Sequence, residues 1–225
     1  MNTHRKKYIA FIFLLLMIVS SCNLEDLVDD TKDSEITAKS KTSEVLSTAR
    51  NNFAADAELS AIYGLNVNIK GQIDLLKPTQ NAFVYVVQSD SERSNEFYVP
   101  VFGASPVRSP INFTSMISLV KDQTAQVILG SVFSKLAAVH IASSVNYDDS
   151  PAVIDKMFQR SDVSTFRSFN PVSKIDMFLI PSKSIDTTIV SNSADWVVNF
   201  YADTTSLVLW LHPGTVSGTI TKISN

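Results

Sequence analysis

The residue whose chemistry is best defined in this sequence is its only cysteine, Cys22. The small residues Ser20 and Ser21 come directly before it, after an apolar run over residues 8–19 and a head, residues 1–7, with three basic side chains. A basic head, an apolar run of about 7–15 residues and small residues at its end are typical of a secretory signal peptide. Because a membrane-spanning helix needs about 20 apolar residues, this run is too short to cross a bilayer. We therefore expect residues 1–21 to be a signal peptide.

The stretch Val19-Ser20-Ser21-Cys22 closely resembles the lipobox of bacterial lipoproteins. The resemblance implies cleavage between Ser21 and Cys22, with fatty acyl chains such as palmitate on the sulfur and on the new amino group. A single acyl chain binds a membrane only marginally, at about 0.8 kcal/mol per buried methylene, whereas two or three give lasting attachment. The alternatives are that Cys22 is an ordinary residue after a cleaved signal, or that residues 8–19 remain as a short uncleaved anchor.

Downstream of Cys22 the sequence marks no catalytic or metal-binding motif. His140 lies in an apolar run, where we expect a hydrogen-bonded structural histidine. His212 precedes Pro213 and Gly214, and we expect it to face solvent at a strand end. Neither histidine has a second His or Cys at the spacing of metal ligands, and the sequence contains neither a nucleophile elbow nor a phosphate-binding glycine loop. The sequence thus predicts no catalytic residue, no metal and no cofactor.

Three aromatic residues, Trp196, Tyr201 and Trp210, form a candidate binding face, because they lie on adjacent predicted strands. Aromatic side chains on one face of a sheet can stack on sugar rings or anchor a partner protein. The alternative is core packing, since Trp196 and Phe200 share one face of their strand and Val208 and Trp210 share one face of the next.

The first elements that would position these groups lie in residues 42–110. Apolar residues recur every four positions from Val45, which predicts a helix over residues 43–61. Three predicted strands follow, rich in alternating, β-branched or aromatic residues, near residues 62–76, 82–88 and 96–102. Residues 111–145 are predicted to be a helical linker segment.

Residues 146–225 repeat the order of a helix and then strands. Ser150 as the cap and Pro151 at the first helical position predict a helix that ends near Gln159. The predicted strands are near residues 174–180, 195–201 and 206–211, followed by a short strand or tail at 215–223. We therefore expect an α+β fold with antiparallel sheets and packed helices, arranged as two helix-plus-three-strand units.

The segment between the lipobox and the first helix, residues 22–41, is predicted to be an acidic flexible tether. It has six acidic residues against three lysines and little apolar surface to offset the entropy of ordering. An alternative is that the acidic residues act as a signal for export to the cell surface. Asn23 follows the cysteine where an Asp favours retention in the inner membrane, so its identity favours the outer membrane.

The composition limits the classes of partner. Cleavage after residue 21 would leave 204 residues, enough for one large domain or two small ones. The signal peptide holds three of the 19 basic residues and none of the 22 acidic ones, so the mature chain has a formal charge of −6. Such a chain lacks the basic patch that nucleic-acid binding needs. With Cys22 as the only cysteine, no internal disulfide can form and the fold depends on its core.

A unit of one helix followed by a three-stranded antiparallel meander resembles a PepSY domain. The local likeness is in residues 195–201 followed by 207–214, since in that family a Trp-containing strand pairs with a strand that ends near a glycine. The usual Asp-x-x-Thr-Gly ending is replaced here by His212-Pro213-Gly214-Thr215. The resemblance implies a domain of secreted or envelope proteins that binds or inhibits peptidases.

Together these features predict a non-enzymatic lipoprotein of the cell envelope that is held to the membrane by its lipid anchor. Its body would be a protein-binding or structural module for an envelope partner, with no role in nucleic-acid binding. The alternative is a glycan- or small-ligand-binding lipoprotein accessory to uptake or degradation. A third hypothesis is an enzyme whose site is assembled from distant carboxylates.

Overall fold

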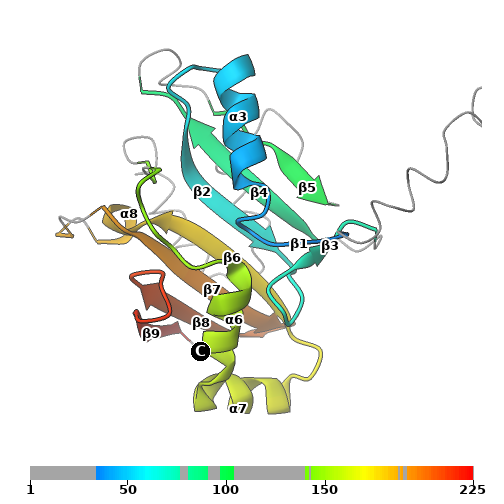
Figure 1. Ribbon diagram of the computed structural model, residues 1–225. Helices are drawn as coiled ribbons and strands as arrows, with labels where there is room; N and C mark the ends of the chain where they lie inside the picture. The colour runs from blue at the N-terminus through cyan, green and yellow to red at the C-terminus, as the bar shows by residue number, and fades with distance from the viewer. Residues whose placement is uncertain are drawn as a thin grey trace, which may run out of the picture. The chain divides into compact units, whose positions relative to one another are not determined.

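In the residues that the structure describes, one antiparallel sheet of seven strands organises the fold, as the computed structural model in Figure 1 shows. The structure describes residues 34–76, 81–90, 97–103, 140–141, 143–186, 188–189 and 192–224. The chain divides into Met1–Ser34 and Glu35–Asn225, and the helices and strands that are described here belong to the second unit. In their order across the sheet, the strands are β5 (Val101–Gly103), β4 (Ala82–Gln88), β2 (Glu58–Leu65), β6 (Lys174–Pro181), β7 (Ala194–Ala202), β8 (Thr205–His212) and β9 (Thr219–Ser224).

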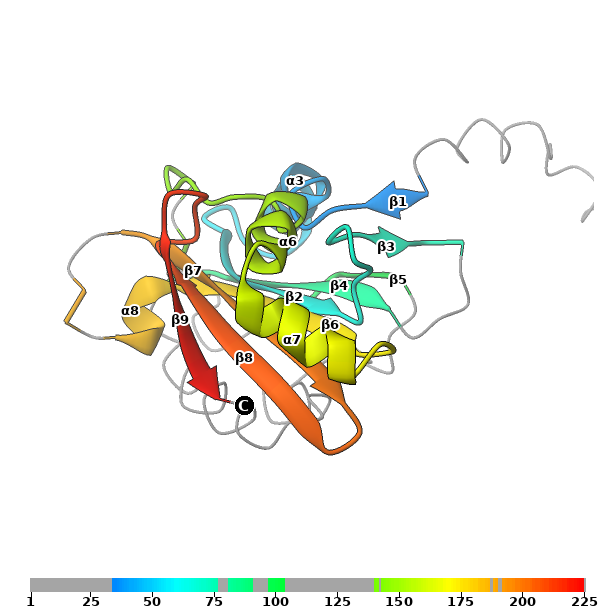
Figure 2. The same ribbon diagram turned by 90° about the horizontal axis from the view of Figure 1, so that it is seen from below.

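Three helices, α3 (Thr42–Asn52), α6 (Ser150–Phe158) and α7 (Ser161–Phe169), pack on one face of this sheet (Figure 2). A short helix, α8 (Ser182–Ile185), follows β6. The N-cap of α6 is Asp149, one residue before the expected cap, and its carboxylate accepts the Ser150 backbone N–H at 2.7 Å. No described helix is long and apolar enough to cross a membrane.

The two faces of the sheet bury separate apolar clusters. On β7, Trp196, Val198 and Phe200 point to the face that the helices cover, and Val197 points to the other face. The central strands are buried on both sides, and each residue of β4 is buried. The sequence of such a strand is a continuous apolar run without alternating polar residues. The sequence therefore does not show which residues point to which face of the sheet.

The expected α+β fold is confirmed, and the order of helix and then strands does occur twice along the chain. The two sets of strands are not separate sheets, because β2 pairs antiparallel with β6, with Tyr63 opposite Phe178. Most of the expected linker, residues 111–145, lies outside the described residues.

Two expected boundaries are corrected. The helix predicted over residues 43–61 ends at Asn52, and β2 begins at Glu58. Because β2 is buried on both faces, it is apolar at most positions and has no alternating pattern. Some of its residues therefore match the four-residue spacing of the preceding helix by chance. Residues 161–169, expected in a loop, form α7, whose first turn is stabilised by the Asp162 carboxylate accepting the Val163 N–H at 2.9 Å.

The last part of the expected tether, residues 35–41, belongs to the folded unit. The strand β1 (Glu35–Ile36) pairs with β3 (Ile73–Asp74), and Ala38 is fully buried. The Asp149 carboxylate accepts hydrogen bonds from the Thr37 hydroxyl at 2.6 Å and the Lys39 N–H at 2.9 Å. Bonds to residues more than a hundred positions away order this segment despite its low hydrophobicity, and no local pattern could show them.

Asp149 therefore caps α6 and binds residues 37–39 at the same time. We expect Asp149→Ala to lower the free energy of unfolding by about 2 kcal/mol, because it removes a helix cap and leaves two donors without an acceptor. Urea denaturation of the full-length protein measures the change. Asp155→Ala, at an exposed position on α6, is the matched control and should change the stability by less than about 0.5 kcal/mol. Equal effects of the two substitutions would contradict the double role of Asp149.

Candidate functional site

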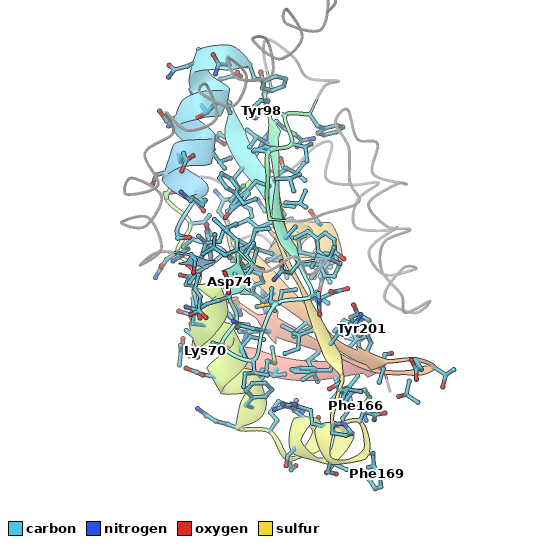
Figure 3. The ribbon with its side chains drawn as sticks, turned by 90° about the vertical axis from the view of Figure 1, so that its right-hand side faces the viewer. Lys70, Asp74, Tyr98, Phe166, Phe169 and Tyr201 are labelled. Atoms are coloured by element: carbon cyan, nitrogen blue, oxygen red, sulfur yellow. The ribbon has the colours of Figure 1, made fainter. Side chains whose placement is uncertain are left out.

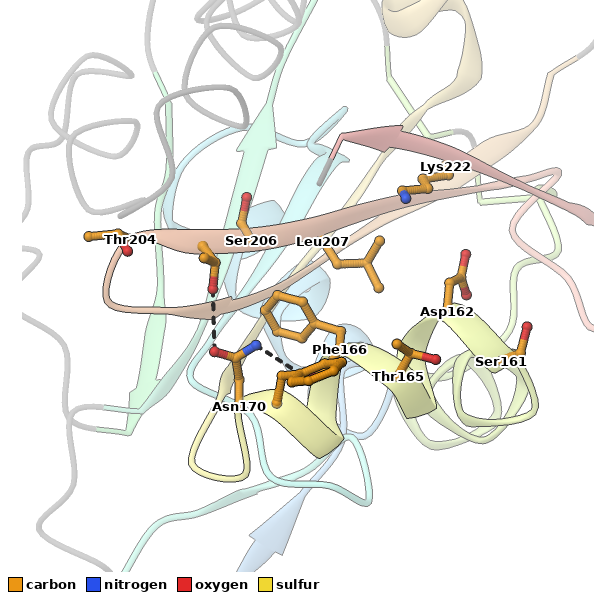
Figure 4. Close-up of a pocket in the computed structure, with 11 residues that line it drawn as sticks. Ser161, Asp162, Thr165, Phe166, Asn170, Thr204, Ser206, Leu207 and Lys222 are labelled. Atoms are coloured by element: carbon orange, nitrogen blue, oxygen red, sulfur yellow. Dashed lines mark hydrogen bonds between the residues drawn. The ribbon is translucent and has the colours of Figure 1, made fainter.

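A groove lies between α7 and the strands β8 and β9, beside the turn of the β7–β8 hairpin (Figure 4). Its volume is about 590 Å³, within the range of about 300–1,000 Å³ that is usual for ligand sites. Its lining comes from the length of α7 on one side and from the hairpin and β9 on the other: Ser161, Asp162, Thr165, Phe166, Phe169, Asn170, Thr204, Thr205, Ser206, Leu207 and Lys222.

The apolar part of the groove combines buried and exposed side chains. Phe166 packs against the core under the helices and faces Leu207, which is buried (Figure 4). Phe169, one turn further along α7, is 81% exposed. Phe166 and Leu207 are therefore positioned by the core, while the Phe169 ring is open to contact from outside.

Some polar groups of the groove already have hydrogen-bond or ion-pair partners within the protein, and others do not. Asn170 links α7 to the hairpin: its amide donates to the Phe166 carbonyl at 2.9 Å and accepts from the Thr205 hydroxyl at 3.4 Å. Hydrogen bonds from Arg160 lower the pKa of the Asp162 carboxyl and pair its charge. The Lys222 ammonium forms no ion pair among the described residues. Because Asp162 is paired with Arg160, the charge in the groove that has no described ion-pair partner is the positive charge of Lys222.

A second hollow, of about 490 Å³, lies at the same end of the sheet and is lined by Val172, Lys174, Tyr201, Ala202 and Asp203. Val172, in the loop from α7 to β6, is 86% exposed. Figure 3 shows Phe166, Phe169 and Tyr201 at this end of the folded unit, away from Tyr98. We call Phe169, Val172 and residues 203–205 the hairpin surface; the groove and the second hollow adjoin it.

A buried carboxyl group lies next to the second hollow. Asp176, on β6, is fully buried and accepts the Asn66 backbone N–H at 2.8 Å. The hydroxyls of Tyr63 and Tyr201 donate to it over 3.3 and 3.5 Å. Burial raises the pKa of Asp176 to about 7 against the opposing effect of these donors. Close to neutral pH this group can therefore both donate and accept a proton.

The three aromatic residues of the expected binding face do not share one face of the sheet. Trp196 is fully buried under the helices, and its indole N–H donates to the Asp148 carbonyl at 3.0 Å. Trp210 contacts the cluster on the opposite face, and its indole N–H donates to the Asp195 carboxylate at 2.7 Å. Trp196 thus packs in the core, and of the three only Tyr201 lines a hollow described here.

Both histidines after Cys22 are hydrogen-bonded to a carboxylate. His140 approaches Asp90 through Nε2 at 2.6 Å, in agreement with the expected hydrogen-bonded role. His212, expected to face solvent, is only partly exposed, and its Nδ1 lies 2.7 Å from the buried carboxylate of Asp195. The Ser182 hydroxyl also donates to Asp195 at 2.6 Å. With three side-chain donors, the Asp195 carboxylate joins α8 to the ends of β7 and β8.

Sequence reasoning did not find the groove, the second hollow or Asp176. The groove depends on α7, which had been assigned to a loop, although Asp162 at a helix start and Phe166 and Phe169 three residues apart are signals of that helix. Asp176 is an acidic residue within an apolar strand, and this pattern marks a buried carboxyl that needs partners.

Ser21 and Cys22, the expected cleavage and lipidation residues, lie outside the described residues. Within the described part of the chain, no group of three His, Cys, Asp or Glu side chains is placed to hold a metal ion.

Comparisons with family models, with curated proteins and with solved structures find no match to this chain. The resemblances to the lipobox and to PepSY domains therefore depend on the residues that carry them.

The raised pKa of Asp176 predicts how stability depends on pH. Folded protein keeps a proton on Asp176 that the unfolded chain has already released, so the free energy of unfolding should fall between pH 4.5 and 7. The contribution of this group is at most about 1.4 kcal/mol per pH unit. Urea denaturation across this range should show a smaller decline for Asp176→Asn than for the unmodified protein. Asp203→Asn, in the exposed hairpin turn, should keep the original decline; the same slope in all three proteins would contradict the assignment.

Proposed function

We propose that this protein is a non-enzymatic lipoprotein of the cell envelope, attached to the outer membrane by acyl chains on Cys22, that binds a partner protein through the hairpin surface. The attachment is supported by the sequence alone, through the basic head, the short apolar run and the residues Val19-Ser20-Ser21-Cys22. The binding role is supported by the exposure of Phe169 and Val172 together.

The hairpin surface has the composition of a protein interface. Phe169 and Val172 are the two most exposed of the large apolar side chains in the described residues, and they lie three positions apart, at the end of α7 and in the loop that follows it. Hydroxyl groups of the hairpin and α7, with the ammonium of Lys222, lie around them in the adjoining groove. Protein interfaces commonly place a few apolar anchors inside such a polar rim, and most of the binding energy comes from the anchors.

The surrounding elements suit this surface to binding. Phe166 and Leu207 are held by the core, and the Asn170 side chain connects α7 with the hairpin. A partner would therefore meet side chains whose backbone is already ordered, which reduces the entropy lost on association. Loops positioned by a rigid scaffold carry binding residues more often than the scaffold does.

The lipid anchor is tested by Cys22→Ser in the native host. Without the thiol there is no site for acylation, so we expect this variant to lose the mass of the acyl chains and to leave the membrane fraction or stay as an uncleaved precursor. Intact-mass analysis and cell fractionation measure both changes. Ser21→Ala keeps a small residue before the cysteine and should be processed as the unmodified protein is. An unmodified Cys22 in native material would contradict the proposal.

The binding surface is tested by photo-crosslinking in intact cells, with a photo-reactive residue in place of Thr204 in the full-length protein. We expect one discrete adduct, and we expect it to disappear when Phe169 and Val172 are both changed to Asp. Because both side chains are exposed, the double substitution should change the free energy of unfolding by less than about 0.5 kcal/mol.

Val216→Asp is the control for this experiment, because Val216 is also an exposed apolar residue but lies outside the hairpin surface. It should leave the adduct in place. An adduct that persists in the Phe169→Asp, Val172→Asp protein would exclude these residues as anchors.

A further inference from the structure

Three of the six large apolar side chains that are exposed in the described residues flank the short strand β3. Ile69 lies in the turn before β3, and Leu75 and Leu76 lie in the turn after it. We call these three residues the β3 surface. Exposed apolar side chains that gather in one place mark contact with another protein or with a membrane.

Hydrogen bonds within the two turns hold this part of the backbone in place. The Asn68 side-chain oxygen accepts the N–H groups of Lys70 and Gln72 at 2.8 and 3.0 Å. The Asp74 carboxylate accepts the Leu76 N–H at 3.0 Å. The apolar side chains of the β3 surface are therefore presented to solvent by ordered turns.

The first residue of β1 lies beside both turns. Glu35 is paired in the register with Asp74, and its carboxylate lies 3.9 Å from the Lys70 ammonium. Figure 3 shows Lys70 and Asp74 in the same part of the folded unit. The chain that comes from Cys22 therefore enters the folded unit at the β3 surface.

The length of that chain limits how far the folded unit can be from its anchor. Residues 23–34 separate Cys22 from Glu35, and even when fully extended this segment spans only about 45 Å. A folded unit of this size is itself about 40 Å across. The β3 surface, next to the point of attachment, is thus the part of the folded unit that a bilayer at Cys22 meets with the least stretching of the segment.

We infer that the β3 surface inserts its three apolar side chains into the phospholipid bilayer that holds the acyl chains of Cys22, an inference that rests on the proposed lipid attachment. Apolar side chains at a membrane surface bury at the boundary between headgroups and acyl chains. The charged groups beside them, Glu35, Lys70 and Asp74, are two acids and one base, so attraction to anionic lipid does not drive the contact. The lipid that fits this surface is therefore zwitterionic.

This contact leaves the hairpin surface available for a partner protein. Phe169 lies in a different part of the folded unit from Lys70 and Asp74 (Figure 3). No residue of the β3 surface lines the groove or the second hollow. Substitutions in the β3 surface should therefore keep the photo-crosslinked adduct at the hairpin surface.

The experiment uses the acylated protein, isolated from the membranes of its host and reconstituted into phosphatidylcholine vesicles. Because acylation occupies the thiol of Cys22, a cysteine introduced by Leu76→Cys is the only one that a thiol-reactive fluorophore can label. Part of the lipid carries a nitroxide quencher on its acyl chains. We expect quenching at position 76 to be about threefold stronger than at a control position away from the bilayer.

Val216→Cys supplies the control position. Val216 is 58% exposed and Leu76 is 61% exposed, so the two labels have similar freedom in solution. Val216 lies in the loop between β8 and β9, on the other side of α6 from β1 and β3 (Figure 2). Equal quenching at the two positions, or no quenching at position 76, would overturn the inference.

A second variant tests whether the apolar side chains themselves make the contact. With the label at Ile69→Cys, the double substitution Leu75→Asp with Leu76→Asp should lower the quenching about twofold, because charged side chains resist burial in lipid. Val216→Asp should leave the quenching unchanged. Unchanged quenching in the double variant would overturn the inference.

The same preparation separates this inference from the proposed function. Protein that does not float with the vesicles in a density gradient lacks the lipid attachment, and both proposals then fail. Protein that floats with the vesicles but is not quenched at position 76 keeps the lipid attachment and overturns only the contact of the β3 surface.

Discussion

The rest of the structure depends on the antiparallel pairing of β2 with β6. This pairing joins the strands that follow α3 to those that follow α7, so that seven strands of the described chain form one sheet. The Tyr63 and Phe178 rings stack across it with centroids 4.5 Å apart. A Cβ on Gly64 would lie 2.8 Å from the Phe83 ring, so a larger residue at this position would have to displace that ring. The β2–β6 pair forms the centre of the sheet, and the other strands pair outward from it on both sides.

Two buried carboxylates on the face away from the helices have different surroundings. Asp195 accepts short hydrogen bonds from Ser182, Trp210 and His212, so both of its carboxylate oxygens have partners and it holds α8 against two strands. Asp176 has one short bond and two long ones. A buried carboxylate whose hydrogen bonds are all short stabilises the structure, whereas one with long hydrogen bonds is only partly satisfied. The contrast assigns a structural role to Asp195, whereas Asp176 is left with hydrogen-bonding capacity that its present partners do not use.

The hairpin surface lies where the sheet and its covering helices both end. The helix α7 stops at Phe169, and the chain needs only a short loop to enter β6 at Lys174. Phe169 and Val172 therefore extend beyond the core, although Phe166, three residues earlier, packs on it. An exposed and a core-packed phenylalanine thus lie one turn apart on the same helix.

The sequence by itself determined the α+β class and, to within a few residues, the bounds of β4, α6 and the last four strands, because these depend on local spacing. It also determined the candidate lipid site at Cys22, because that site depends on a contiguous motif. Only the tertiary structure decided that the two sets of strands share one sheet, that Trp196 and Trp210 point to opposite faces, and that residues 35–41 are ordered by Asp149. The groove, the second hollow and the burial of Asp176 likewise depend on the tertiary structure. The physical reason is that each of these depends on pairing or hydrogen bonding between residues far apart in the chain, which no local pattern records.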